Sequence, residues 1–460
     1  MMRLSDVAAA IQGQSIGHDA GFLRVSIDSR TLAEGDLFIA IRGDRFDGHD
    51  FVEQAGALGA AGAVVDEEFH TSASIPLLKV RDTRAALRAL ASSWRSRMTA
   101  TIAAVAGSNG KTTTKEMIAG IFRQHAGDAA VLSTAGNQNN EIGVPLTLLN
   151  LRPGHRYAVV ELGMNHGGEV ARLAEVIRPE IAVVTNAQRE HLEFIGSSSE
   201  AAVENSCLYE KTSNSAIAVV NFDDPHKDVF KRSIGKRRCI SFGLSKGAAV
   251  TAKIEASESE SLIRVYLPGE QFKVRLHIQG MHNVRNALAA VGVAYAAGVP
   301  ADAIRRGLEA FHPYRGRLDQ KALPGGVRLI DDTYNANPDS VRAAIDVLAS
   351  SHGRKILILG DMGEVGTHRD SVHREVGDYA RECGIDTLLA IGEATTETVA
   401  SFGKGATHFD SVEGLLAAAI PTFGPGTTVL VKGSRFMRME RIVQEVLLVA
   451  SGPVEESHAA

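Results

Sequence analysis

A glycine-rich segment between an apolar strand and an amphipathic helix constrains the fold of this chain most strongly. The apolar run Thr101–Ala106 leads into Gly107-Ser108-Asn109-Gly110-Lys111-Thr112-Thr113. Glycines let backbone N–H groups turn toward phosphate oxygens, and a helix N-terminus adds partial positive charge at the same place. The buried face of the helix is expected to contain Met117, Ile118, Ile121 and Phe122. The segment therefore predicts a nucleotide phosphate site within a parallel α/β sheet.

The polar residues of this loop predict which nucleotide groups it would contact. Lys111 is expected to bridge the β- and γ-phosphates of ATP, and the Thr112 hydroxyl is expected to reach Mg²⁺. The widest P-loop pattern has a glycine five residues before Gly110, where this chain has Val105, so the loop is a shortened form. The alternative is a glycine turn that only joins strand to helix, and the Gly-Lys-Thr sequence counts against it.

Alternating apolar runs and helical patterns predict three α/β domains, at residues 1–98, 99–313 and 314–460. The first is a small domain that mixes short strands and helices. The second is a mononucleotide-binding parallel sheet with an added antiparallel hairpin, because residues 263–267 and 272–276 alternate in polarity around Pro268-Gly269. In the third, four apolar strands are separated by helical stretches, which is typical of a Rossmann-like domain.

Charge and cysteine content exclude several classes of protein. A net charge of −5 argues against a nucleic-acid-binding protein. The three cysteines, Cys207, Cys239 and Cys383, are too few and too widely spaced for a disulfide framework or a zinc site. The N-terminus lacks the apolar region of a signal peptide, and no apolar run is long enough to span a bilayer. We therefore expect a cytoplasmic protein without membrane insertion. We also expect a monomer, although none of these features specifies the oligomeric state.

Two polar residues follow strands of the central region. Glu161 closes the run at 157–160, and His191 comes after Ile181–Val184. Doubly wound sheets bind ligands at the carboxyl ends of their strands, so Glu161 is expected to hold Mg²⁺ between ATP phosphates. The alternatives are a helix-capping acid for Glu161 and an ordinary structural role for His191.

The phosphate loop and four later segments together resemble the Mur ligase family, the peptidoglycan-precursor amide ligases. Those segments are Glu161-Leu162-Gly163-Met164-Asn165, His191-Leu192-Glu193, His282-Asn283-Val284-Arg285-Asn286-Ala287-Leu288 and Asp331-Asp332-Thr333-Tyr334-Asn335-Ala336-Asn337-Pro338. They occur in the expected order and cover essentially the whole chain. The resemblance implies an ATP-dependent ligase that activates a carboxylate as an acyl phosphate.

Within that family, residues 136–145 and 334–338 resemble the branch that adds D-alanyl-D-alanine. The implied substrates are ATP, a UDP-N-acetylmuramoyl tripeptide and D-Ala-D-Ala, with diaminopimelate or lysine as the third residue of the tripeptide. The alternatives are a tripeptide-forming Mur ligase, a folylpolyglutamate synthase, and a nucleotide-binding regulatory protein that has lost ligation. The two asparagine-rich segments count against the first two alternatives.

The resemblance also implies roles for individual residues. The expected catalytic residues are Lys111, Glu161 and His191, and His191 would carry a second metal ion. The expected contacts to ATP come from Gly107, Ser108, Asn109, Gly110, Lys111, Thr112, Thr113, Asn286 (adenine), Arg317 and Asp332 (ribose). The expected metal ligands are Thr112, Glu161 and His191. The expected substrate-binding residues are Ser29 and Arg30 for UDP, and Asn137, Asn139, Asn335 and Asn337. Residues 360–364 and 432–435 are expected near the dipeptide.

The chain departs from the family pattern at one metal-binding position. Most Mur ligases carry a carbamylated lysine a short helix after the histidine segment, and Asn205 stands there in this chain. A neutral amide oxygen would hold a cation less tightly than an anion, unless another acid compensates. The nearest candidates in the sequence are Glu204 and Glu193, and Lys211 is the only nearby lysine. We expect a ligase that does not depend on carbamate.

Overall fold

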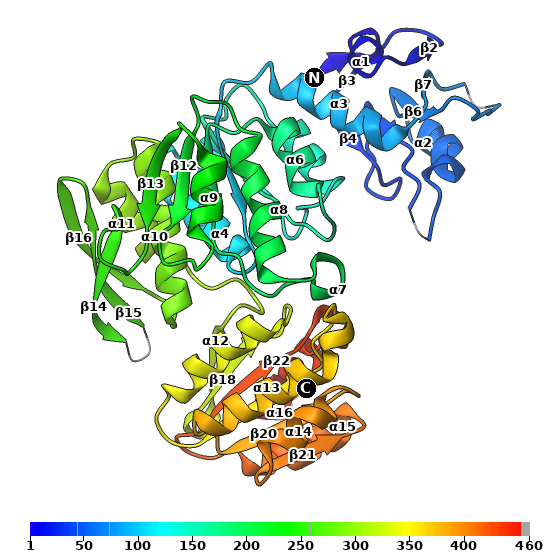
Figure 1. Ribbon diagram of the computed structural model, residues 1–460. Helices are drawn as coiled ribbons and strands as arrows, with labels where there is room; N and C mark the ends of the chain where they lie inside the picture. Colours follow the sequence, from blue (N-terminus) through cyan, green and yellow to red (C-terminus); the bar gives the residue numbers. More distant parts are fainter. Residues whose placement is uncertain (44, 73, 258–259, 452–460) are drawn as a thin grey trace, which may run out of the picture.

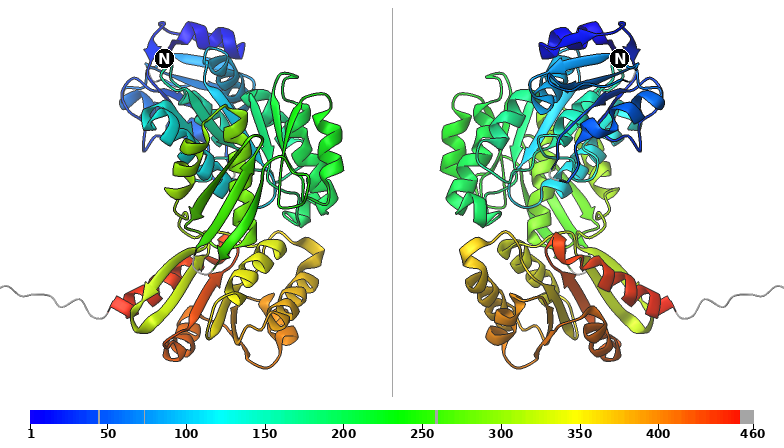
Figure 2. Two further views of the ribbon diagram at one scale, coloured as in Figure 1. Left: turned by 90° about the vertical axis from the view of Figure 1, so that its left-hand side faces the viewer. Right: turned by 90° about the vertical axis from the view of Figure 1, so that its right-hand side faces the viewer.

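The computed structural model describes residues 1–43, 45–72, 74–257 and 260–451. Three α/β units follow one another along the chain, and the N-terminal and C-terminal units lie at opposite ends of the central one (Figures 1 and 2). Residues 452–460, which the sequence assigns to the third domain, lie outside the described residues. Within the described ranges, no helix has the length and apolar character needed to cross a membrane.

The N-terminal unit, blue in Figure 1, contains short elements around a five-stranded sheet. Its elements are β1 (Met2–Arg3), α1 (Leu4–Ile11), β2 (Gln14–Ile16), β3 (Gly21–Phe22), β4 (Val25–Ser26), β5 (Leu37–Ile39), α2 (Val52–Ala57), β6 (Gly62–Asp66), β7 (Leu77–Val80) and α3 (Thr83–Arg95). The sheet order is β2-β7-β6-β5-β4, and β1 pairs with β3 separately.

The central unit contains a six-stranded parallel sheet of order β13-β12-β11-β8-β10-β9. Its elements are β8 (Thr101–Ala106), α4 (Lys111–Ala126), β9 (Val131–Ser133), α5 (Gly143–Leu149), β10 (Tyr157–Glu161), α6 (Glu169–Ile177), β11 (Ile181–Val184), α7 (Leu192–Ile195), α8 (Ser198–Glu210), β12 (Ile217–Asn221), α9 (Lys227–Ile234), β13 (Arg238–Phe242), β14 (Thr251–Ser257), β15 (Ser261–Leu267), β16 (Glu270–Leu276), α10 (Met281–Ala296) and α11 (Ala301–Glu309). Strand β8 lies between β10 and β11. The loops after these three strands therefore emerge side by side.

The expected antiparallel hairpin is confirmed as β15 and β16. The structure adds a third strand, β14, and the three strands form a sheet of their own. A single bridge between Phe242 and Val250 links this region to the edge strand β13. The small sheet shares a hydrophobic core with α4, α10 and α11 on one face of the parallel sheet.

The opposite face of the parallel sheet is covered by α5, α6, α8 and α9, and its core is continuous with that of the N-terminal unit. Helix α3 makes this connection. The Trp94 indole N–H donates to the Leu151 carbonyl at 3.1 Å. The buried Arg95 guanidinium donates to the Ile177 carbonyl at 3.1 Å and pairs with Glu180 at 2.6 Å. The N-terminal unit is thus packed firmly on the central one.

The C-terminal unit, yellow to red in Figure 1, contains a six-stranded sheet of order β17-β18-β22-β19-β20-β21. Its elements are β17 (Asp319–Leu323), β18 (Val327–Asp332), α12 (Pro338–Ala349), β19 (Lys355–Gly360), α13 (Arg369–Glu382), β20 (Thr387–Ile391), α14 (Thr395–Phe402), β21 (Ala406–Phe409), α15 (Val412–Ala419), β22 (Thr428–Lys432) and α16 (Glu440–Ser451). Helices α12, α13 and α14 cover one face, and α15 and α16 cover the other. The four expected strands, at residues 327–330, 355–359, 388–391 and 428–431, are present as β18, β19, β20 and β22, and β17 and β21 extend the sheet at its two edges.

Candidate active site between the central and C-terminal units

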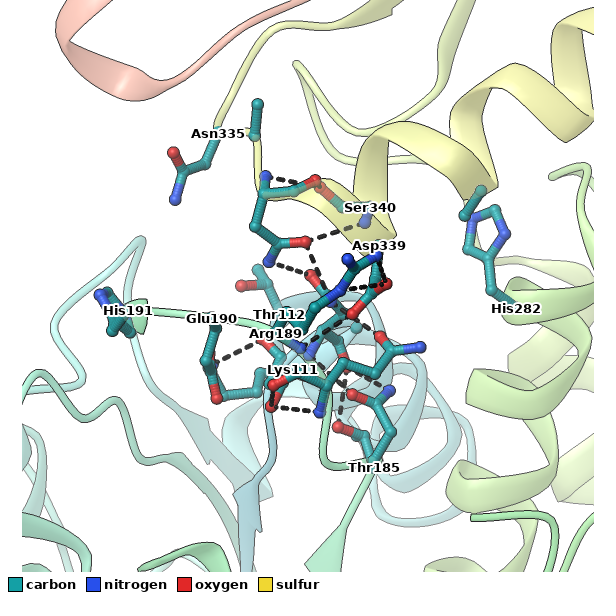
Figure 3. Close-up of a pocket in the computed structure, with 18 of the residues that line it drawn as sticks. Lys111, Thr112, Thr185, Arg189, Glu190, His191, His282, Asn335, Asp339 and Ser340 are labelled. Carbon is teal, nitrogen blue, oxygen red and sulfur yellow. Dashed lines mark hydrogen bonds and ion pairs between the residues drawn. The ribbon is translucent and has the colours of Figure 1, made fainter. Parts of the chain in front are cut away.

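A cleft of about 830 Å³ separates the carboxyl edge of the central sheet from the loops of the C-terminal unit. Its central wall is formed by the phosphate loop and by the segments that follow β10 and β11. Its other wall is formed by the segments that follow β18, β19 and β22. Figure 3 shows side chains from both walls facing one another across a short distance.

The phosphate loop has a backbone that only glycine can adopt at two positions. Gly107 and Gly110 have φ angles of +125° and +79°. A Cβ on Gly107 would lie 2.1 Å from the Thr185 hydroxyl, and one on Gly110 would lie 2.3 Å from the Asn286 amide oxygen. Helix α4 starts directly after the loop, and no side chain caps its N-terminus. The first N–H groups of α4 are therefore free to bind an anion.

Lys111 is folded back onto the loop that precedes it. Its ammonium donates to the carbonyls of Gly107 at 2.5 Å and Ser108 at 3.0 Å. It also lies 3.2 Å from a carboxylate oxygen of Glu190. Figure 3 draws both side chains in the cleft. The Glu190 side chain is 5% exposed, and its other oxygen, Oε1, has no hydrogen-bond partner among the described residues. Lys111 thus neutralises a buried acid that the sequence did not single out.

Glu161 lies at the end of β10 beside the loop, as expected. Its Oε1 atom accepts hydrogen bonds from the Thr112 hydroxyl at 3.2 Å and the Asn139 amide at 2.9 Å. Its Oε2 atom is buried and has no partner within the described ranges. Asn137 lines the same cleft. A buried carboxylate oxygen without a donor is suited to a cation, because an uncompensated buried charge is costly.

His191 links the two walls of the cleft. It has a left-handed backbone, with φ +46°, and directly precedes α7. Its Nδ1 atom lies 2.7 Å from a carboxylate oxygen of Glu364, in the segment after β19. The contact with His191 lowers the pKa of Glu364 below its ordinary value. A carboxylate on one ring nitrogen fixes the orientation of the imidazole and leaves the other nitrogen for a ligand.

Arg189 joins the two units by a pair of carboxylates on C-terminal helices. Its guanidinium contacts Asp339 in α12 at 2.6 Å and Glu375 in α13 at 2.7 Å. The Arg189 backbone N–H also donates to Asp339 at 2.8 Å. These two hydrogen-bonded carboxylates raise the pKa of Arg189. Nothing in the local sequence pointed to this contact, because its partners lie 150 and 186 residues further along the chain.

Two further contacts cross the cleft beside the phosphate loop. Asn109 and Asn337 exchange side-chain hydrogen bonds, the shorter of them 2.9 Å long. Asn337 also caps α12 by accepting from the Ser340 backbone N–H at 2.8 Å. The Arg317 guanidinium donates to the Thr112 hydroxyl at 3.2 Å. The fold therefore brings two expected site residues to the phosphate loop. Asn337 was expected to bind substrate, and Arg317 was expected to bind ATP.

The remaining residues expected at ATP lie on the same cleft. Asn286 in α10 is buried against Gly110 and donates to the Asn283 side chain at 3.1 Å. Asp332 closes β18 and forms an ion pair with buried Lys432 at 2.6 Å. Asn335 accepts from the Arg435 backbone N–H at 3.2 Å. Asn286 and Asp332 belong to different units, so both would be near one nucleotide only while the cleft is closed.

Ser29 and Arg30 are not part of this cleft. They lie between β4 and β5 in the N-terminal unit. The Arg30 guanidinium pairs with Asp28 at 2.7 Å, and its side chain is 86% exposed. This contact lowers the pKa of Asp28 to about 2. Arg30 is accessible to an anion, although Asp28 already offsets much of its charge.

The position where the sequence departs from the family pattern is buried inside α8. The Asn205 side chain is 1% exposed and donates to the Ala201 carbonyl at 2.9 Å. The expectation that Glu204 could compensate is not supported by its contacts. Its two carboxylate oxygens accept from the N–H groups of Gly168 and Val170, at the start of α6. Lys211 pairs with Glu175 at 2.8 Å and does not line the cleft.

Family models match three consecutive parts of the chain. The "Mur ligase family, catalytic domain" matches residues 23–95, the "Mur ligase middle domain" matches 105–294, and the "Mur ligase, glutamate ligase domain" matches 316–435. The chain is similar to the UDP-N-acetylmuramoyl-tripeptide--D-alanyl-D-alanine ligase of Escherichia coli (strain K12). The two are 36% identical over 445 residues, which cover 96% of this chain and 97% of the relative.

Solved structures agree with the sequence relatives. A crystal structure of MurF from Acinetobacter baumannii superposes with a TM-score of 0.90 at 34% identity, covering 96% of this chain and 98% of that one. MurF ligase from Thermotoga maritima, in complex with ADP, superposes with a TM-score of 0.84 at 28% identity, covering 93% and 98%.

Proposed function

This chain belongs to the Mur ligase family, and we propose that it joins D-alanyl-D-alanine to a UDP-N-acetylmuramoyl tripeptide with cleavage of ATP. The product is the UDP-linked pentapeptide used in peptidoglycan synthesis. The relatives named for this activity match nearly the whole chain. The observation that carries the proposal is the meeting of the phosphate loop, Glu161 and His191 with C-terminal residues in one cleft.

Each domain has its own part in this proposal. We assign the UDP-linked precursor to residues 1–98, ATP to residues 99–313 and the amine substrate to residues 314–460. Ser29 and Arg30 would contact UDP, and Arg30 would exchange part of its pairing with Asp28 for the diphosphate. Asn335, Asn337 and the segments after β19 and β22 would contact the dipeptide or the tripeptide end. The protein would act as a monomer in the cytoplasm.

ATP would bind with its phosphates on the loop before α4. No side chain caps the first N–H groups of α4, and Lys111, the first residue of that helix, supplies a positive charge beside them. Asn286 would hydrogen-bond adenine, Asp332 the ribose hydroxyls, and Arg317 the phosphates. Binding would require Lys111 to leave the carbonyls of Gly107 and Ser108, which its ammonium contacts in this structure.

The residues beside the loop fit Mg²⁺. Glu161 offers a buried oxygen without a donor, Thr112 offers a hydroxyl, and His191 offers a ring nitrogen. The described residues include no group of three His, Cys, Asp or Glu side chains that already surrounds one point. The buried carboxylate of Glu161 suits Mg²⁺, which is usually bound through one or two carboxylates plus substrate phosphates. When bound, Mg²⁺ would neutralise charge on the phosphate oxygens.

The side chains that line the cleft offer a positive charge for the first step of the proposed reaction and contacts that would protect its intermediate. The tripeptide carboxylate takes the γ-phosphoryl group of ATP to give an acyl phosphate, ADP leaves, and Lys111 would offset the charge that develops on the phosphate oxygens. The amine of D-Ala-D-Ala then attacks the acyl carbon, and phosphate leaves. An acyl phosphate hydrolyses if water reaches it, so the contacts of Arg189, Asn109 and Arg317 across the cleft would protect it.

The direct test is phosphate release from ATP with defined pairs of substrates. We expect release when the UDP-tripeptide and D-Ala-D-Ala are present together, and little with either alone. D-Glutamate or diaminopimelate in place of the dipeptide is the control for the tripeptide-forming Mur ligases. Equal turnover with a single amino acid would overturn the assignment. The absence of ligation with every pair would favour a nucleotide-binding regulatory protein.

A further inference from the structure

Glu190 combines deep burial with an unused carboxylate oxygen on the wall of the nucleotide cleft. Its Oε2 atom contacts the Lys111 ammonium at 3.2 Å, and its buried Oε1 atom has no hydrogen-bond partner among the described residues. Of the carboxylates that line the cleft in the described ranges, only Glu161 and Glu190 have such an oxygen. Both therefore face the same requirement for positive charge.

The partner that now satisfies Glu190 is the residue expected to leave it. Lys111 is the loop lysine, and a phosphate bound at the start of α4 would draw its ammonium away from Glu190. The carboxylate, which is 5% exposed with Lys111 beside it, would then be without a cation. Breaking a buried ion pair by removing one partner is strongly destabilising, because the other charge is left uncompensated. Nucleotide binding should therefore bring a second cation to this carboxylate.

We propose that Glu190 is a ligand of the divalent cation that accompanies ATP, so that a metal ion replaces the Lys111 ammonium on this carboxylate. The inference rests on the proposed ATP-dependent function. Glu190 is adjacent in sequence to His191, and Mg²⁺ prefers carboxylate oxygens and phosphate oxygens as ligands. Glu190 would thereby supply the anion that Asn205 does not supply.

Other acids near this position are occupied elsewhere. Glu204 accepts two backbone N–H groups at the start of α6. Glu364 contacts His191, and Asp339 contacts Arg189. Glu193 is exposed and does not line the cleft. Besides Glu161, Glu190 is therefore the cleft acid with a carboxylate oxygen available for a cation among the described residues.

The test is the affinity for Mn²⁺, measured by electron paramagnetic resonance of the free ion during titration of the full chain with a non-hydrolysable ATP analogue. We expect Glu190→Gln to weaken Mn²⁺ binding by about tenfold or more, as changes at metal-site residues typically do. Glu193→Gln is the matched control, since the same chemical change is made two residues beyond His191, and it should leave Mn²⁺ affinity unchanged. Melting temperatures would be compared for each variant. Glu190→Asp keeps the charge and should give an intermediate Mn²⁺ affinity, which provides a second reading if Glu190→Gln fails to fold.

If Glu190 only pairs with Lys111 and binds no metal ion, the expected results for Glu190→Gln are different. Glu190→Gln would then free Lys111, tighten binding of the nucleotide analogue and leave the Mn²⁺ affinity at the wild-type value. That outcome, or an equal loss in Glu193→Gln, would overturn the inference. Failure of the wild-type chain to bind Mn²⁺ with the analogue would instead count against the proposed function itself.

Discussion

Replacing Arg189 with Met should loosen the contact between the central and C-terminal units. The substitution keeps the aliphatic stem and removes a guanidinium that contacts Asp339 at 2.6 Å and Glu375 at 2.7 Å. Hydrogen bonds to charged groups contribute about 1.5–3 kcal/mol each, whereas exposed ion pairs contribute about 0.2–1 kcal/mol. The Arg189 side chain is 29% exposed and the Glu375 side chain is 33% exposed. Solvent screening therefore brings the contribution of each hydrogen bond below about 1.5–3 kcal/mol.

We therefore estimate that the Arg189 contacts stabilise the closed arrangement by about 1–3 kcal/mol in total, or about five- to 150-fold in the ratio of closed to open molecules. The ATP site is completed across the cleft, so kcat/KM for ATP should fall, by at most the factor by which the closed-to-open ratio falls. Small-angle scattering with ADP should show a larger radius of gyration for Arg189→Met than for the wild type. The difference should shrink at about 0.5 M salt, where exposed charges are screened.

Arg342→Met is the matched control. Arg342 also contacts Glu375, at 2.9 Å, but both residues lie within the C-terminal unit. It should change neither the radius of gyration nor kcat/KM by more than about twofold, because an exposed pair contributes little. The reasoning would be refuted if Arg189→Met kept the wild-type radius and kinetics, or if Arg342→Met reproduced its defects.

Three further predictions concern single residues. Lys111→Ala should lower the rate of phosphate release by about a hundredfold or more, as loss of a charge-stabilising donor does. Circular dichroism should show that the variant is folded. Near-wild-type turnover would contradict the role of the loop in binding phosphate. Because Asn205 cannot be carbamylated, the ligation rate in CO₂-depleted buffer should not change when bicarbonate is added, and a clear rescue would show that a lysine is modified after all. Burial, together with the nearby cations Lys432 and Arg285, lowers the pKa of His282 to about 4. Because the folded-state pKa lies below the unfolded value of 6.5, protonation of His282 favours the unfolded chain. The free energy of unfolding therefore keeps this contribution above pH 6.5 and loses it as the pH drops toward 4. In denaturant unfolding measured from pH 7 to 4, the free energy of unfolding of His282→Gln should fall less steeply with decreasing pH than that of the wild type. An unchanged pH dependence would contradict the role given to His282.

The sequence predicted the elements whose residues carry a strong local pattern. Strand β8 begins and ends at the expected residues, because a strand buried on both faces of a parallel sheet is a continuous apolar run. Strands β14, β17 and β21 are among those that were not expected. They lie at sheet edges and have few buried side chains, so the apolar signal is weak.

The site was predictable where one motif places a side chain at the end of a strand, as for Lys111 and Glu161. It was not predictable where function depends on two surfaces meeting. The partners of Arg189 are set by how the C-terminal unit sits, and no local spacing encodes that. Glu190 could have been noticed as a charged residue directly before His191, but its burial appears only in the fold.

Helix α3 limits how this protein could be divided or recombined. A cut after residue 98 would remove Trp94 from the Leu151 carbonyl and expose the face of α5 and α6 that α3 covers. A cut before Thr83 would deprive α1 of its packing partner. Neither cut leaves two fragments with complete cores. An N-terminal unit exchanged between related enzymes would therefore function only if α3 were inherited together with the helices it packs on.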